Sequence, residues 1–131
     1  MKAYWDSSAL VLASSDTTLR LRLRMERGFS RTHALAEIFS AFTSGNLAIR
    51  LDAESALKVI QGLAGDLDFI DLNADEVLEG LKDAKKKGVR GGRVHDFLHA
   101  LAAEKAGAEE LLTADRNDFV MLSTKVQVIQ V

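Results

Sequence analysis

Short apolar runs alternate with capped or amphipathic helical segments along this chain, and this alternation most constrains its fold. Strands are predicted over residues 3–5, 69–72, 111–113 and 126–131. Helices are predicted over residues 7–13, 33–43, 52–63, 73–87 and 93–105, with a helical or looped connection over 115–122. Strands that alternate with helices predict an α/β fold, with a central, largely parallel sheet flanked by α-helices.

One further segment carries two conflicting signals. Residues 19–24 alternate Leu with Arg, which is a strand pattern. Ser15 or Asp16 can cap a helix before this run, and Gly28 can stop one after it. We favour a helix over residues 16–27 because the cap and the glycine bracket it.

The composition bounds the class of protein. With 131 residues the chain is long enough for one core, so residues 1–131 are expected to form a single domain. The absence of cysteine excludes a disulfide framework, thiolate catalysis and cysteine-bound zinc. The first residues lack signal-peptide features, and no apolar run approaches the roughly 20 residues of a membrane span. We therefore expect a soluble, cytoplasmic protein with no membrane contact.

Four acidic residues are candidates for a functional site. Asp6 and Asp115 follow predicted strands, and in an open parallel sheet ligands bind beyond the carboxyl ends of the strands. Glu37 and Asp96 lie on predicted helices among mostly small neighbours, which would let another element or a ligand approach. Taken singly, each acid is as easily explained as a solvated surface residue. Together they indicate a site for Mg²⁺ or Mn²⁺, because carboxylate oxygens suit hard cations and convergent acids repel one another without one.

Four motifs in order resemble the PIN-domain family, most closely its VapC-type toxins. They are Tyr4-Trp5-Asp6-Ser7-Ser8-Ala9-Leu10, Ala34-Leu35-Ala36-Glu37-Ile38, Gly92-Arg93-Val94-His95-Asp96-Phe97-Leu98-His99-Ala100 and Leu112-Thr113-Ala114-Asp115-Arg116-Asn117-Asp118-Phe119. The match spans residues 1–131 in the expected order and spacing. The run containing Arg20, Arg22 and Arg24 and the absence of proline depart from the family pattern without touching the acids.

The resemblance implies a metal-dependent endoribonuclease that leaves 5′-phosphate and 3′-hydroxyl ends. Asp6 and Asp96 would be the principal metal ligands, and Glu37 and Asp115 would complete the site directly or through water. In the same family terms, Ser8 and Thr113 would orient the carboxylates. Asp118 would be an outer acid, although a capping or surface role explains it better.

The resemblance also implies partners. VapC-type toxins are held inactive by a VapB-like antitoxin and usually pair as homodimers. Two alternatives stay open: a PIN-domain nuclease of RNA processing without an antitoxin, and a non-catalytic receiver-like signalling or binding module. A receiver also carries acids at strand ends, but here Asp71 and Lys125 are poorly placed for its phosphoacceptor and lysine.

Charge is unevenly distributed, although the whole chain sums to −2. Residues 51–81 hold eight acids and one base, whereas residues 82–105 hold seven bases and three acids. A cluster of basic residues precedes Asp96 and comprises Lys85, Lys86, Lys87, Arg90 and Arg93. These side chains could bind RNA phosphates, although such a run is usually a solvated helix end. His33, His95 and His99 are interpreted as packing or surface residues, because no third nitrogen or sulfur ligand accompanies them.

Overall fold

The computed structural model describes residues 2–45, 50–120, 122 and 125–131 of the chain. Its strands are β1 (Ala3–Trp5), β2 (Gly28–Ser30), β3 (Leu67–Phe69), β4 (Glu110–Thr113) and β5 (Gln127–Gln130). Its helices are α1 (Ser7–Ala13), α2 (Thr17–Glu26), α3 (His33–Thr43), α4 (Ala53–Ala64), α5 (Ala74–Leu81), α6 (Arg93–Ala106) and the 3₁₀ turn η1 (Arg116–Phe119). None of the helices in these ranges is long and apolar enough to cross a membrane.

The five strands form one sheet in the order β3-β2-β1-β4-β5, and every described pairing is parallel. The predicted fold class is therefore confirmed. The strand order also argues against the receiver-like alternative, because receivers of the CheY type have the flavodoxin-like order 2-1-3-4-5. In the observed order β1 lies at the centre, so Asp6 leaves the sheet between the ends of β2 and β4.

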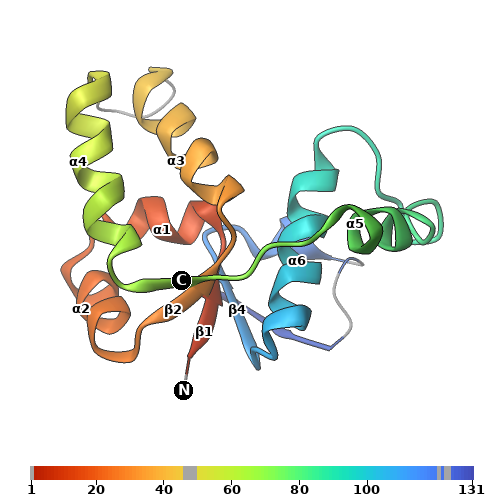
Figure 1. The fold of residues 1–131 in the computed structure, drawn as a ribbon. Helices are drawn as coiled ribbons and strands as arrows, with labels where there is room; N and C mark the ends of the chain where they lie inside the picture. The colour runs from red at the N-terminus through yellow and green to blue at the C-terminus, as the bar shows by residue number, and fades with distance from the viewer. Residues whose placement is uncertain (1, 46–49, 121, 123–124) are drawn as a thin grey trace.

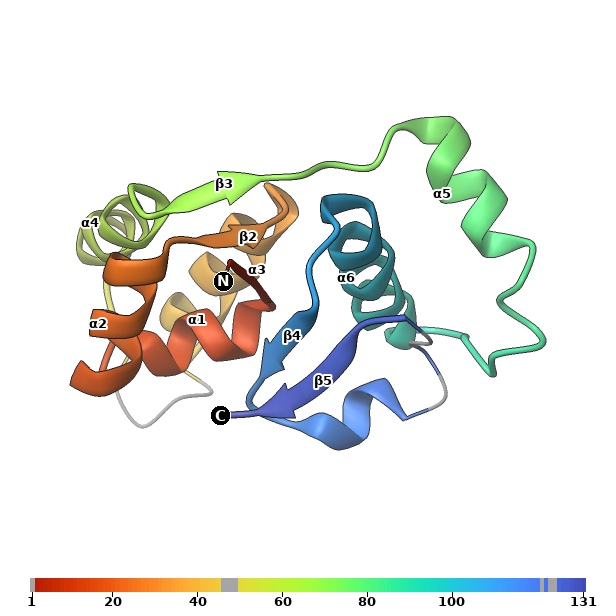
Figure 2. The ribbon, with the colours of Figure 1, turned by 90° about the horizontal axis from the view of Figure 1, so that it is seen from below.

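Helices cover the two faces of the sheet unequally (Figures 1 and 2). Helices α1 to α4 lie on one side, where Trp5, Leu10 and Ile38 belong to the larger buried cluster. Helix α6 lies on the other side, where Tyr4 packs with a run of alanines. The two sets of helices flank the carboxyl edge of the sheet, and α3 and α6 approach the site from opposite faces.

Two capped helices match their predicted starts closely. Asp16 caps α2 by accepting a hydrogen bond from the Leu19 amide, which confirms the helical interpretation of the Leu-Arg run. Asn73 and Glu76 form a reciprocal capping box at the start of α5. The capping side chains therefore located these helices more reliably than the hydrophobic pattern did.

Helix α2 ends just before Gly28, as predicted, but Gly28 also begins a strand that the sequence pattern missed. The helix ends at Glu26, and its C-cap Arg27, with a positive φ of 59°, turns the chain into β2. A Cβ atom on Gly28 would lie 2.6 Å from Trp5 Cδ1 and 2.7 Å from Trp5 Nε1. The glycine therefore allows β2 to pass against the indole ring of β1.

Three other expectations need correction. The strand predicted over residues 69–72 lies earlier, at Leu67–Phe69, where it pairs with β2. Helix α5 ends at Leu81 rather than Lys87, because the following turns fold Val89 back to donate to the Ala84 carbonyl. The spacing of Leu35, Ile38, Phe39 and Phe42 predicts that they share the buried face of α3. In the structure this face is rotated: it includes Ala34, whereas Phe39 stays 39% exposed.

Candidate active site

Asp6 is fixed at the carboxyl end of β1 and caps the helix that follows. Its side chain is almost fully buried, and Oδ1 accepts hydrogen bonds from the Ala9 amide at 2.8 Å and the Ser8 hydroxyl at 2.7 Å. Among the described residues, every hydrogen bond to this carboxylate falls on Oδ1. Asp6 is therefore held rigidly while Oδ2 is left for another partner.

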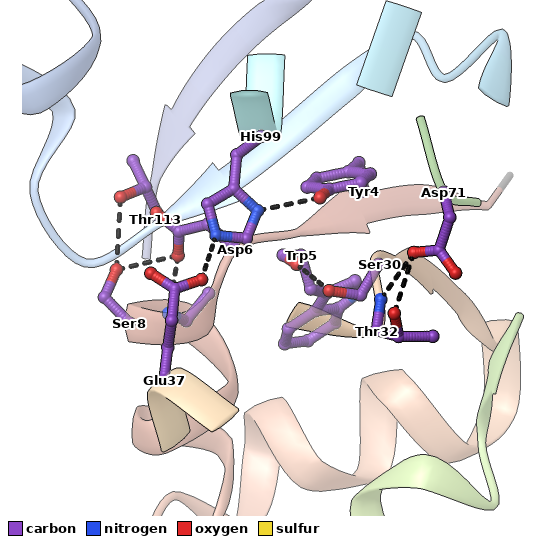
Figure 3. Close-up of polar contacts among 11 residues, drawn as sticks. Tyr4, Trp5, Asp6, Ser8, Ser30, Thr32, Glu37, Asp71, His99 and Thr113 are labelled. Carbon is purple, nitrogen blue, oxygen red and sulfur yellow. Dashed lines mark hydrogen bonds and ion pairs between the residues drawn. The ribbon is translucent and has the colours of Figure 1, made fainter. Parts of the chain in front are cut away.

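Two hydroxyl groups connect Asp6 to the neighbouring strand β4 (Figure 3). Ser8 Oγ lies 3.2 Å from Thr113 Oγ1 and accepts a hydrogen bond from the Ala114 amide at 2.9 Å. The Asp115 amide in turn donates to Thr113 Oγ1. Ser8 and Thr113 thus tie the ends of β1 and β4 together, so their place in the structure suits the orienting role that the resemblance implied.

Asp115 begins the 3₁₀ turn η1 at the same edge of the sheet. Its Oδ1 accepts a hydrogen bond from the Asn117 amide at 2.9 Å, which makes it the cap of the turn. Asp118 lies within that turn and is mostly exposed. The structure therefore places both acids beside Asp6 without bringing either into direct contact with it.

Glu37 contacts a histidine for which the sequence predicted only packing. His99 is 1% exposed; its Nε2 lies 2.9 Å from Glu37 Oε1 and its Nδ1 lies 2.7 Å from the Tyr4 hydroxyl (Figure 3). These hydrogen bonds link β1 through α6 to α3. The available sequence signal was that His99 and Asp96 are three residues apart on one helix, which places them on neighbouring turns.

The protonation of this chain of contacts follows from its electrostatics. Burial alone would raise the pKa of Glu37, but the hydrogen bond and charge of His99, followed by the charges of Arg31 and His33, lower it. Burial raises the pKa of Tyr4 well above its usual value. An ionised Glu37 only accepts, so we assign a proton to His99 Nε2, which donates it to the carboxylate. Tyr4 and His99 therefore orient the Glu37 carboxylate.

Asp96 and Asp118 show the opposite effect. Burial, followed by the negative charge of Asp118, raises the pKa of Asp96 to about 6, and Asp6 and Glu37 contribute to the same shift. Burial and the charges of Asp115 and Asp6 raise the pKa of Asp118. These mutual shifts indicate that the carboxylates lie close enough to repel one another, although the charge of Arg93 partly offsets the effect at Asp118.

The donor set suits a hard cation, although it is not a closed metal cage. Within the described ranges, no group of three or more His, Cys, Asp or Glu side chains has the spacing to hold an ion. Mg²⁺ commonly uses one or two carboxylates and completes its shell with water and substrate phosphates. The buried Asp6, with one oxygen left over, and the repelling Asp96 fit that open type of site.

Most of the basic cluster lies in the turns between α5 and α6, and Arg93 is the first residue of α6. Lys85 and Arg90 line a hollow of about 570 Å³ with Gly88 and Val89. The Lys87 ammonium lies 5.6 Å from the centre of the Phe97 ring, and Arg93 donates to the Val120 carbonyl. The turns therefore hold these side chains in a fixed segment directly before the helix of Asp96.

Two exposed histidines stack between α3 and α6. The rings of His33 on α3 and His95 on α6 are stacked, with their centres 5.4 Å apart. This contact joins the helices that carry Glu37 and Asp96. The sequence had placed His95 beside Asp96 but gave no sign of its partner.

Comparison with protein-family models and with curated proteins gives no significant match. Solved structures do match. The crystal structure of PAE2754 from Pyrobaculum aerophilum has a TM-score of 0.72 at 18% identity, over 98% of this chain and 89% of that one. VapBC2 from Rickettsia felis, bound to a DNA fragment from their promoter, has a TM-score of 0.71 at 17% identity, over 99% and 98%. At this identity the likeness establishes the fold alone: this chain has an α/β, PIN-like fold.

Proposed function

We propose that this protein is a metal-dependent endoribonuclease and the toxin of a VapBC-type toxin–antitoxin pair. The observation that carries the proposal is the set of carboxylates gathered at the carboxyl edge of a PIN-like fold. Within the described residues, no lysine or arginine forms an ion pair with any member of the set, which comprises Asp6, Glu37, Asp96, Asp115 and Asp118. Such a site requires a cation, and an RNA phosphodiester is a substrate that a cation can bridge to it.

Each acid has its own task in this proposal. Asp6 presents Oδ2 to the cation because Ala9 and Ser8 hold Oδ1. Asp96 becomes a full ligand when it loses its proton, and Glu37 keeps its charge through His99. Asp115 and Asp118 add negative charge from η1 and complete the site through water. When bound, Mg²⁺ or Mn²⁺ supplies an acidified water and offsets the charge that builds on the phosphate.

The substrate side of the proposal rests on the basic cluster. Lys85, Lys86, Lys87, Arg90 and Arg93 lie on one connected segment ahead of Asp96. Cations placed there can neutralise phosphates on either side of the bond that is cut, and their binding would weaken with salt. Reversing the charge of Lys86 and Lys87 should weaken RNA binding and flatten its salt dependence.

The partner side of the proposal rests on exposed apolar side chains. Leu21 and Met25 are 58% and 76% exposed on α2, and Leu78 is 62% exposed on α5. A VapB-like antitoxin and a second copy of this chain are the occupants that the fold suggests. Co-expression with the protein encoded by the adjacent gene, followed by measurement of the complex mass, tests both. A chain that cleaves RNA with no small protein encoded beside it would instead favour the RNA-processing alternative.

A cleavage assay with mapped product ends tests the nuclease itself. Total RNA is incubated with the protein over a titration of Mg²⁺ and of Mn²⁺, beside Asp6→Asn and the remote control Asp16→Asn, which only caps α2. We expect metal-dependent cuts with 5′-phosphate and 3′-hydroxyl ends in the wild type and in Asp16→Asn. Full cleavage by Asp6→Asn, or cleavage that does not respond to metal, would overturn the proposal.

A further inference from the structure

Arg31 is a buried cation whose place in the fold is not explained by the nuclease site described so far. It directly follows β2, at the same edge of the sheet as Asp6, and it is only 8% exposed. No described protein atom accepts a hydrogen bond from its Nε, which is fully buried. An arginine guanidinium stays charged, and a buried charge without an anionic partner is costly.

The chain around Arg31 is anchored on both sides (Figure 3). Before it, the Ser30 hydroxyl donates to the Trp5 carbonyl at 2.9 Å. After it, the Thr32 amide and hydroxyl both donate to Asp71 Oδ1, at 2.8 and 3.1 Å. Arg31 is therefore held in a defined position at the entrance of α3 rather than placed on a free loop.

Arg31 lies close to site residues on β1 and α3. It directly follows β2, whose Phe29 packs against the α6 cluster. The charge of Arg31 acts on both the Tyr4 hydroxyl and the Glu37 carboxylate. Glu37 makes its close contact with His99, however, and no described carboxylate lies within ion-pairing distance of Arg31.

We propose that Arg31 binds a phosphate of the RNA substrate on the Glu37 side of the acidic site. A guanidinium donates several hydrogen bonds in one plane and matches the oxygens of a phosphate. The bound phosphate supplies the anion that buried Arg31 lacks. This inference rests on the proposed ribonuclease function and extends it, because it assigns a substrate contact to a residue outside the four motifs.

The contact is tested by measuring RNA affinity in a variant that binds RNA without cleaving it. The Asp96→Asn background is titrated with a labelled 12-nucleotide single-stranded RNA, with and without Arg31→Gln. Loss of a charged hydrogen bond is expected to weaken binding by about tenfold to a hundredfold. The slope of log affinity against log salt should fall by about 0.7, the change for one lost phosphate contact on a single strand.

Two further variants separate this contact from charge in general. Arg24→Gln removes an exposed arginine from α2, at the far edge of the sheet, and should change the affinity by less than about twofold. Arg31→Lys keeps the charge without the planar donor group and should recover only part of the affinity. If Arg31→Gln folds normally and its RNA affinity and salt slope are unchanged, the proposal is overturned, and Arg31 only offsets the charge of Glu37.

A measurement on the unsubstituted arginine keeps the test valid if Arg31→Gln does not fold. The Nε–H signal of Arg31 is followed by NMR as the RNA is added, and then as an RNA with an uncharged methylphosphonate backbone is added. A shift with the first and not the second supports the contact, and no shift with either overturns it. A wild-type protein that neither binds nor cleaves RNA would instead overturn the proposed function.

Discussion

Acidic residues pair with bases at the amino edge of the sheet, where the strands begin, and face one another at the carboxyl edge, where the strands end. At the amino edge three acids meet bases: Arg20 pairs with Asp66 at 2.7 Å, Arg22 with Glu110 at 3.2 Å, and Arg27 and Lys2 with Asp68. These contacts lower the pKa of Asp68. At the carboxyl edge the acids face one another, and the pKa values of Asp96 and Asp118 rise.

This difference indicates which edge acts on a ligand. A chain with 17 bases and 19 acids has enough lysine and arginine to pair the acids of both edges. The ion pairs lie at the amino edge, where Arg20 and Arg22 join α2 to the starts of β3 and β4. At the carboxyl edge the carboxylates still repel one another. This repulsion lowers the stability of the fold and favours the binding of a cation there. The whole-chain charge of −2 averages these two edges and conceals both.

RNA cleavage should show the largest difference between variants at the two edges of the sheet. Asp96→Asn removes a proposed metal ligand, and the rate of metal-dependent RNA cleavage should fall by at least about a hundredfold. Asp68→Asn makes the same chemical change away from the proposed ligands and should leave the rate within about twofold, because Asp68 pairs with Lys2 and Arg27 at the surface, where salt screens the charges. The initial rate on a fluorescent RNA checks both. Equal losses in the two variants would contradict the assignment of the site to one edge.

Metal should stabilise the fold only through the carboxyl edge. At about 100 times its dissociation constant, Mn²⁺ or Mg²⁺ should raise the free energy of unfolding by about 2.7 kcal/mol, because it binds the folded chain. Thermal unfolding with and without the metal measures this gain. It should persist in Asp68→Asn and shrink in Asp6→Asn. A gain of the same size in both variants would place the metal elsewhere.

The hydrogen bonds behind Glu37 should have a smaller effect on catalysis. Tyr4→Phe removes the hydroxyl that meets His99 Nδ1 at 2.7 Å, so Glu37 loses part of its orientation. We expect kcat to fall by about tenfold while KM changes little, which is the signature of a positioning residue. Arg22→Gln, which breaks an ion pair at the amino edge, is the matched control and should leave both constants unchanged. A loss confined to KM would assign Tyr4 to substrate binding instead.

The sequence predicted the architecture well because local signals specify it. The caps at Asp16 and Asn73 and the glycine after α6 each act through hydrogen bonds within a few residues. It missed β2, which is three residues long and exists because Gly28 lets the chain pass against Trp5. That contact joins parts of the chain more than twenty residues apart, so no local pattern reports it.

The sequence predicted which residues are candidates for the site, but not the contacts between them. The positions of Asp6 and Asp115 followed from the rule that parallel strands end at one edge. The role of His99 depended on which side of α6 faces Tyr4 and Glu37, and its small alanine neighbours gave no strong hydrophobic pattern. The charge of Asp118 acts on Asp96 across two elements that no spacing in the sequence relates. Geometry between distant elements therefore accounts for most of what the sequence left open.

The smallest predicted effect is a pH dependence of opposite sign at the two edges. Without metal, the folded pKa of Asp96 is about 6, against 3.8 for the free side chain, so its protonated form favours folding. That contribution is present below about pH 4 and is lost as the pH rises through 6. Asp96→Asn cannot ionise, and at pH 8 it should be more stable than the wild type by about 1 kcal/mol, a value reduced for solvent screening.

Asp68 should behave in the reverse direction, because Lys2 and Arg27 lower its pKa. Its contribution to stability is present above about pH 4 and is lost as the pH falls through its folded pKa. Asp68→Asn should therefore be less stable than the wild type at pH 8, and the difference should shrink at pH 3. Urea unfolding in EDTA at pH 3, 6 and 8 measures both variants. Stability changes of the same sign at pH 8 would mean that the two edges handle their charges alike, and the distinction between a paired edge and a metal-binding edge would fail.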